Sequence, residues 1–215
     1  MPNWVINRIT VTGPDEKIQE FEEKMIKRVD EDSDEKVFSF HSILPTPEEL
    51  INTIAPNPRP IIKEVIDEKG NKVEVQIYRD TINEFEIETA LREGRTPPNP
   101  IPCNNATPEM CDNLLMKYGR TNWYDWQNFN WGTKWDACDP NYDYETKTLD
   151  FQTAWSSPEK IILEMSKMFP DLSFDGYFAD EDIGSNAGTI DNGVVNWAEG
   201  EEALSIAKEL WGIEE

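Results

Sequence analysis

The sequence is poor in the residues that most often bind metals or carry catalysis. Among 215 residues there is one histidine, His41, and there are three cysteines, Cys103, Cys111 and Cys138. No two cysteines have the CxxC spacing of a zinc site, and three are too few for a disulfide framework. We therefore expect no metal, no cofactor and unpaired thiols, as in a reducing cytosol.

Long apolar runs and enzyme motifs are also missing. No stretch approaches the roughly 18 apolar residues of a membrane span, and the N-terminus lacks the layout of a signal peptide. No GxSxG, HExxH, P-loop or dinucleotide-binding glycine pattern occurs. His41 stands alone in an apolar stretch, which favours a structural role over that of a general base. The sequence predicts a non-enzymatic cytoplasmic protein that does not bind membranes.

Positive charge is scarce. Against 43 acidic residues there are 20 basic ones, and residues 136–215 contain 19 acidic residues and only four lysines. Binding to a phosphate backbone depends on Lys and Arg that release counterions, so direct binding to nucleic acid is not expected. Two interpretations remain. The acidic surface either keeps the protein soluble, or it imitates nucleic acid or docks a basic partner.

If the acidic surface imitates nucleic acid or docks a basic partner, the carboxylates involved are expected in the C-terminal 80 residues. The candidate acidic interaction surface consists of Asp139, Asp143, Glu145, Asp180, Glu181, Asp182, Glu199, Glu201 and Glu202. A calcium-loop register also runs from Asp139 to Asp150, but Tyr144 stands where that loop needs glycine. These carboxylates are therefore expected to be solvated rather than to bind a metal ion.

Tryptophan is abundant, and half of it lies in one place. Four of the eight tryptophans fall within residues 122–136, NWYDWQNFNWGTKWD, and another follows at 155. Indoles contribute large apolar area to a core, and each ring N–H needs an acceptor. The block predicts either a core wedge or an aromatic-lined pocket or stacking platform whose cation is Lys134. The candidate binding residues are Trp123, Trp126, Trp131, Lys134, Trp135 and Trp155.

Hydrophobic periodicity predicts the order of the elements. Strands are expected at 4–11, 37–44, 149–155, 172–178 and 189–197, and a β-hairpin at 61–78. Helices are expected at 15–29, after Thr46, at 81–93, 107–118, 159–169 (capped by Ser157-Pro158) and 201–211, with a proline-dense linker at 94–102. The pattern favours an α+β fold: a ferredoxin-like, antiparallel-rich sheet with helices on one face. Residues 1–51 and 119–215 would form this core, and 52–118 an inserted subdomain of hairpin and helices.

Several phrases in the sequence resemble one protein family. They are MPNW at the start with Asn7, TGP at 12–14, LPTPEEL at 44–50, NWYDWQNFNWGTKWDA at 122–137 and FQTAWSSP at 151–158. In order and spacing they resemble the YubB-type ferredoxin-like domain family of plasmid and phage proteins. The resemblance covers the first 50 residues and most of 118–178. Family members typically carry cysteine after MPNW, whereas this chain has Val5, which speaks against a redox or metal role there.

The resemblance implies a ferredoxin-like fold and a mobile-element origin, hence a bacterial cytoplasm, and it brings no catalytic residues. Together with the charge it leads to a hypothesis: an acidic phage- or plasmid-encoded interaction protein binds a basic host or defence protein as inhibitor or nucleic-acid mimic. The alternative is a small-ligand-binding protein or enzyme with a pocket around Trp131 and Lys134. A structural role in a larger assembly is the third possibility.

Overall fold

The chain divides into two units in the computed structural model, which describes residues 2–28, 36–51, 53, 60–67, 69–78 and 108–213. The first unit combines Met1–Pro45 with Gln127–Glu215, and the second is Thr46–Trp126. The predicted helix at 81–93 and the proline-dense linker at 94–102 lie outside the described residues. No helix within those described is long and apolar enough to cross a membrane.

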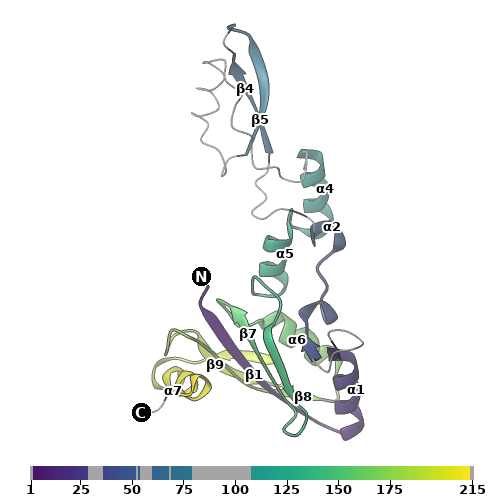
Figure 1. Cartoon of the computed structure of the whole chain (residues 1–215), viewed down its shortest axis with the longest axis vertical. Coiled ribbons are helices and arrows are strands. Elements are labelled where there is room, and N and C mark those ends of the chain that lie inside the picture. Colours follow the sequence, from purple (N-terminus) through teal and green to yellow (C-terminus); the bar gives the residue numbers. More distant parts are fainter. Residues whose placement is uncertain are drawn as a thin grey trace. The chain divides into compact units, whose positions relative to one another are not determined.

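A six-stranded antiparallel sheet is the centre of the first unit (Figure 1). Its strands, in the order β10-β9-β8-β1-β7-β6, are β1 (Trp4–Thr12), β6 (Cys138–Asp143), β7 (Thr148–Ala154), β8 (Ser173–Asp180), β9 (Ala187–Asp191) and β10 (Val194–Trp197). Helix α1 (Asp15–Met25) follows β1, and α6 (Glu159–Met168) follows β7. The succession β1-α1-β6-β7-α6-β8 is the split βαβ pattern of ferredoxin-like folds. The predicted α+β, ferredoxin-like fold is therefore confirmed.

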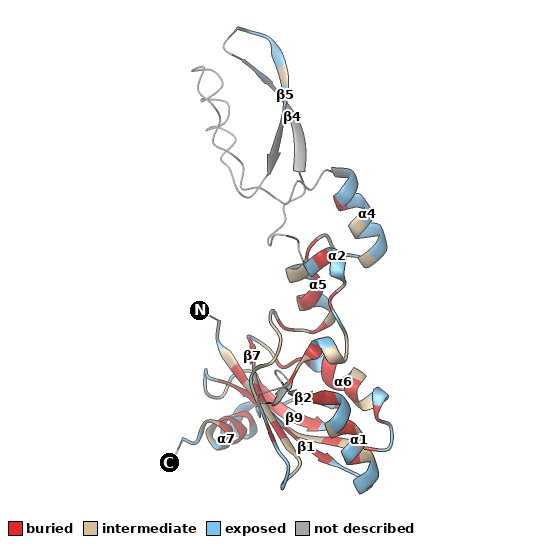
Figure 2. Ribbon diagram, turned by 45° about the vertical axis from the view of Figure 1, so that its right-hand side comes forward, coloured by how far each residue is buried: buried red, intermediate tan, exposed pale blue. Residues whose placement is uncertain are grey.

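The main core lies between one face of this sheet and the helices α1 and α6. Alternation along β1 puts Val5, Ile9 and Val11 on that face, where all three are buried. Phe21 of α1 packs against Phe174 of β8 with 5.6 Å between the ring centroids. Buried residues gather where the two helices face the sheet (Figure 2). Each fully buried apolar side chain contributes about 1.5–3 kcal/mol, so this layer holds the unit together.

Helix α7 (Gly200–Trp211) covers part of the opposite face (Figure 1). The prediction placed helices on one face. Helices α1 and α6 do share a face, and α7 lies on the other because β8 and β9 offer small apolar side chains there. Alanines dominate this contact, which lets the helix approach the strands closely. The contact consists of Ala179, Ala187, Ala203, Ile206, Ala207 and Leu210.

The predicted core strand at 37–44 is wrong. The short strands β2 (Ile26–Arg28) and β3 (Lys36–Phe38) pair with each other in a separate sheet, so the predicted helix at 15–29 ends early, at Met25. A 3₁₀ turn follows β3, and the carboxylate of Asp136 accepts the N–H of Phe40 at 2.6 Å. Phe38 and Phe40 both point into the core. Two buried residues two positions apart are the pattern of a strand, although the backbone forms a 3₁₀ turn here.

The second core strand is formed instead by β6, which sequence reasoning missed. The sequence of this segment indicates only a calcium-loop register, because Pro140 and three polar residues hide the alternation. The predicted single strand at 189–197 is the hairpin β9–β10. Its turn contains Asn192 and Gly193, both with positive φ, a sequence pair that favours tight hairpin turns.

The second unit contains short elements and a hairpin. They are α2 (Glu48–Ile51), β4 (Pro60–Ile66), β5 (Lys72–Tyr78), α4 (Pro108–Tyr118) and the beginning of α5 (Trp123–Asn130). The predictions of a hairpin at 61–78 and of a helix at 107–118 are confirmed. Leu50 and Cys111 are buried, and Lys117 Nζ lies 2.7 Å from Glu49 Oε1. Asn122 Oδ1 accepts the N–H of Asp125 at 2.8 Å and so caps α5.

Gly176 in β8 is the position where the sheet tolerates a side chain least. A Cβ atom on Gly176 would lie 1.9 Å from the carbonyl oxygen of Arg8 in β1. Any side chain must therefore push the two central strands apart. We expect Gly176→Ala to lower the free energy of unfolding by about 3 kcal/mol, measured by urea denaturation. Tyr177→Thr, at the next and exposed position, is the control and should change it by less than about 1 kcal/mol. Equal losses for the two variants would contradict this prediction.

Candidate functional site

Trp131 belongs to the core of the first unit and not to a pocket. Its side chain is 0% exposed. The ring N–H donates to the carbonyl oxygen of Leu44 at 2.8 Å, and the ring packs edge-on against Phe40 and His41. The prediction that Trp131 lines a binding pocket is therefore wrong, because the indole is enclosed and its polar atom is already bonded. For Trp131 the core-wedge interpretation holds.

Trp123 and Trp126 belong to the second unit. Trp126 is 7% exposed, so it offers little surface to a ligand, contrary to the prediction. Trp123 is partly exposed, contacts the ring of Tyr124 at 5.8 Å, and its backbone N–H donates to Thr53 Oγ1 at 3.0 Å. Trp123 is thus explained by packing in the short segment that carries it, and Trp126 is a buried residue of the same helix.

The remaining predicted residues meet at the end of the sheet where β1 begins and β7 ends. The rings of Trp4 and Trp135 are 6.0 Å apart between centroids. Lys134 Nζ lies 4.2 Å from the Trp135 centroid and 5.4 Å from that of Trp155. One ammonium group is thus shared by two indole rings at the distances of cation–π attraction. We call Trp4, Lys134, Trp135 and Trp155 the aromatic–cation cluster.

Trp155 is both exposed and strained. Its side chain is 44% exposed, and its φ angle is 68°, in the left-handed region. For a residue with a bulky side chain this conformation costs roughly 1–2 kcal/mol. Hydrogen bonds hold it on both sides: Trp155 N–H donates to the Asn3 carbonyl at 2.9 Å, and Asn186 Nδ2 donates to the Trp155 carbonyl at 2.8 Å. Strain retained by surrounding contacts is typical of functional positions.

A buried polar network lies directly beneath this loop. Asn7, on the core face of β1, is 0% exposed. Its Oδ1 accepts from Ser157 Oγ at 2.7 Å, and its Nδ2 donates to Thr153 Oγ1 at 2.9 Å and to the Val5 carbonyl at 3.1 Å. Thr153 Oγ1 in turn donates to the carbonyl of Ser156 at 2.7 Å. The predicted capping role of Ser157 is therefore wrong: its hydroxyl binds Asn7, and no side chain caps α6.

Asp180 also lies at this end of the sheet, but inside it. The residue is 4% exposed. Its Oδ1 accepts from Asn3 Nδ2 at 3.1 Å and from the N–H of Asp182 at 2.9 Å, and its Oδ2 accepts from Asn186 Nδ2 at 2.9 Å. The prediction that Asp180 belongs to an acidic interaction surface is wrong, because its carboxylate is enclosed by donors. Since Asn3 and Asn186 also bind the backbone of Trp155, Asp180 ties the loop after β8 to the cluster.

The other predicted carboxylates are exposed, at separate places. They are Asp139, Asp143, Glu145, Glu181, Asp182, Glu199, Glu201 and Glu202. Glu181 borders the cluster directly, since its Oε1 accepts the N–H of Trp4 at 3.2 Å. The segment between β10 and α7, which contains Glu199, lies at the same end of the sheet, because Trp197 pairs with Gly188 near the start of β9. Glu201 and Glu202 follow in the first turn of α7.

Asp143 and Glu145 lie at the opposite end of the sheet, where Asp143 ends β6 and Glu145 belongs to the turn before β7. The backbone N–H groups of Thr146 and Glu145 donate to the Asp143 carboxylate at 3.1 and 2.7 Å. These bonds favour the ionised form and lower the pKa of Asp143. Asp143 therefore fixes a turn and is remote from the cluster.

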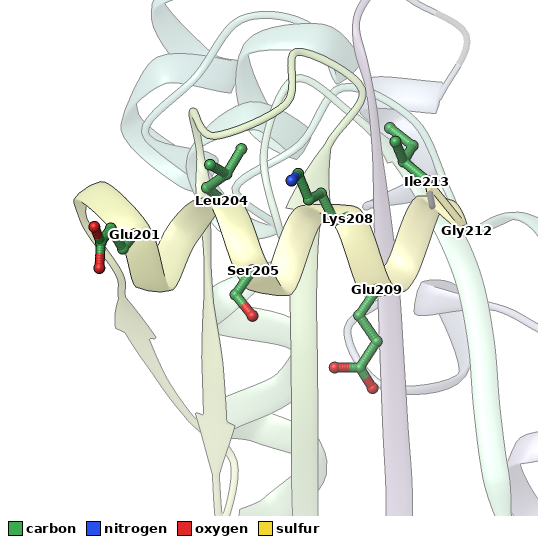
Figure 3. Close-up of a pocket in the computed structure, with 7 residues that line it drawn as sticks. All are labelled: Glu201, Leu204, Ser205, Lys208, Glu209, Gly212 and Ile213. Carbon is green, nitrogen blue, oxygen red and sulfur yellow. The ribbon is translucent and has the colours of Figure 1, made fainter. Parts of the chain in front are cut away.

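Two other hollows occur in the first unit. A pocket of about 530 Å³ runs along one side of α7, past Leu204 and Lys208 (Figure 3). A hollow of about 320 Å³ lies on the open face of the sheet beside Tyr177 and Arg8. The first is lined only by α7 and the two residues after it, without converging groups from another element. In the second, Arg8 Nε is already paired with Asp150 at 2.7 Å. The aromatic–cation cluster is therefore the better candidate.

Sequence reasoning missed part of this site. Trp4 was assigned only to a strand, and neither Asn3 nor Asn186 was singled out. The sequence does contain a signal for this region, because MPNW and Asn7 are among the segments that resemble the family. The resemblance alone gives these residues no physical role. The three-dimensional contacts supply that role: these residues position Trp155 and border Lys134.

The Asn7 network gives a testable prediction. Ser157→Ala leaves the Asn7 Oδ1 atom buried without its donor, which costs about 1–3 kcal/mol. We expect a loss of this size in the free energy of unfolding and a red shift of tryptophan emission as the Trp155 loop loosens. Ser156→Ala, one residue earlier, removes a hydroxyl that only donates to a neighbouring carbonyl at 3.2 Å. It should cost less than about 0.5 kcal/mol. A Ser156→Ala variant as unstable as Ser157→Ala would refute the network's role.

The comparisons with known proteins agree with the fold. Searches of curated proteins and of solved structures found no match. Residues 130–209 match the family model described as the ferredoxin-like domain in Api92-like protein. The matched segment includes Lys134, Trp135 and Trp155 and runs from the end of α5 into α7. Residues 130–209 are thus similar to a ferredoxin-like domain, in agreement with the fold of the first unit.

Proposed function

We propose that this chain is an acidic interaction protein that binds a basic surface of a protein partner. Its contact site is the aromatic–cation cluster together with Glu181 and Asp182. One observation carries the proposal: the exposed indole of Trp155 and the partly exposed indole of Trp135 already hold an ammonium group and are bordered by the Glu181 carboxylate.

The charge of the chain favours a basic partner. The net charge is −23, and only four lysines oppose 19 acidic residues in 136–215. Such a field attracts positively charged surfaces and raises association rates, while it repels phosphate backbones and a second copy of the chain. Within the cluster Lys134 is the one basic side chain, and it lies over the rings.

The aromatic rings add a short-range attraction for cations to the long-range effect of the charge. An indole face attracts an ammonium or guanidinium group by about 0.5–1 kcal/mol at exposed sites, and more when the group is desolvated. Trp155 is fixed by backbone hydrogen bonds to Asn3 and Asn186, so little conformational freedom is lost when a partner binds. Rigid aromatic residues of this kind often dominate the affinity of an interface.

Inhibition by nucleic-acid mimicry is the biological role that this chemistry supports. Carboxylates presented to a nucleic-acid-binding protein can take the place of phosphates. The resemblance to plasmid and phage proteins suggests that this partner is a host or defence protein in the bacterial cytoplasm. The alternative, a ligand pocket around Trp131, is not supported, because Trp131 is buried in the core.

The contact site is tested with an arginine-rich hexapeptide as the probe. Trp155→Ala should weaken binding about fivefold or more, since it removes one of the two rings. The measurement is isothermal titration at 50 mM and 300 mM salt. The matched control is Trp197→Ala, which removes another half-exposed tryptophan, 53% exposed, from β10. The control should stay within about twofold of the original chain.

Two results would overturn the proposal. If the original chain binds no basic peptide at 50 mM salt, the acidic-interaction function is wrong. If it binds and Trp155→Ala binds equally well, the contact site is elsewhere. The mimicry is tested separately: a basic protein captured from bacterial lysate must lose its bound DNA or RNA when the purified chain is added.

A further inference from the structure

We infer that the two indole rings of Trp135 and Trp155 form a site for an arginine side chain of the partner, and that Lys134 is its internal occupant. This inference rests on the proposed function, since it names the group that the same site receives. Lys134 therefore does not assist binding: its ammonium group must leave the two rings before the arginine side chain of the partner can bind there.

The geometry shows a filled site. Lys134 Nζ lies over both rings, at 4.2 and 5.4 Å from their centroids, where a ligand cation would lie. Trp4 supports the first ring from the side, with 6.0 Å between the Trp4 and Trp135 centroids. Glu181, bonded to the backbone of Trp4, places a carboxylate at the border. Rings, cation and counter-charge are all present, and the cation comes from the chain itself.

Arginine is the group best able to displace this lysine. A guanidinium is planar and weakly hydrated, so it stacks on an aromatic face with a small loss of hydration. An ammonium is compact and strongly hydrated, and the flexible, partly exposed stem of Lys134 lets its head group move from the rings into water. A guanidinium also pairs with a carboxylate in a bidentate geometry that an ammonium lacks, and the Glu181 carboxylate borders the cluster at Trp4.

The strain at Trp155 fits the same role. The two hydrogen bonds to Asn3 and Asn186 hold the Trp155 backbone in the left-handed conformation, and the side chain on this backbone is 44% exposed. A lysine over the rings keeps the exposed indoles covered while no partner is bound. Exposed aromatic surface otherwise invites unspecific association.

The test compares three variants of the full chain with arginine and lysine hexapeptides. Lys134→Ala empties the site, and Lys134→Arg fills it more tightly. Lys160→Ala is the matched control, since Lys160 Nζ lies 4.1 Å from the Phe129 ring elsewhere in the first unit. Dissociation constants come from isothermal titration, and two-dimensional NMR follows the indole N–H signals of Trp135 and Trp155.

We expect Lys134→Ala to bind the arginine peptide about two- to fivefold more tightly than Lys160→Ala does. Both variants lose one positive charge, but only Lys134→Ala frees the rings of Trp135 and Trp155 for the peptide. Lys134→Arg should bind it about twofold or more weakly than the original chain. The indole signals of Trp135 and Trp155 should move on titration, and the arginine peptide should bind more tightly than the lysine peptide.

The inference is overturned if Lys134→Ala gains no more than Lys160→Ala, since charge alone then explains the gain. It is also overturned if Lys134→Ala binds more weakly, or if Lys134→Arg binds as well as the original chain. These results leave the acidic-interaction function standing, because peptide binding persists in them. If the original chain binds neither peptide, both the proposed function and this inference are wrong.

Discussion

The sheet end that carries the candidate site depends on one buried amide, that of Asn7. It lies on the core face of β1 between Val5 and Ile9, where an unsatisfied polar group costs about 1–3 kcal/mol. The chain after β7 satisfies it by turning back so that the Ser157 hydroxyl reaches Asn7 Oδ1. The same turn brings Trp155 into its left-handed conformation. A requirement of the core therefore determines what is displayed at the surface.

The loop after β8 is fixed by a second buried polar group. The Asp180 carboxylate accepts from Asn3 and Asn186, and both of these residues also hold the backbone of Trp155. Exposed carboxylates follow at 181 and 182, so the same hydrogen bonds position both the acidic border and the Trp155 ring. Asp180 thus contributes to the site through position, although its own charge is hidden from any partner.

The sequence predicted elements whose apolar spacing is set by the core, such as β1, α6 and the ferredoxin-like pattern itself. It failed where tertiary contacts override spacing. The segment at 37–44 alternates like a strand, yet Asp136 holds it in a 3₁₀ turn, and β6 carries a proline and polar residues at an edge. For the site, composition selected Trp135, Lys134 and Trp155 correctly as neighbours. Burial of Trp131 and Asp180 depends on distant segments, so local sequence could not reveal it.

Charge and aromatic contact act over different distances, and this separation explains why the chain combines them. Exposed charges are screened beyond about 8 Å at physiological salt, so in the proposed function the acidic surface would attract basic proteins without selecting among them. Cation–π attraction acts only within about 6 Å of a ring centroid and depends on its geometry. Lys134 lies within that range of two rings, so a competing cation must fit them better than an ammonium does. In the function that we propose, the acidic residues would therefore bring a partner near, and the tryptophans would determine where it is held.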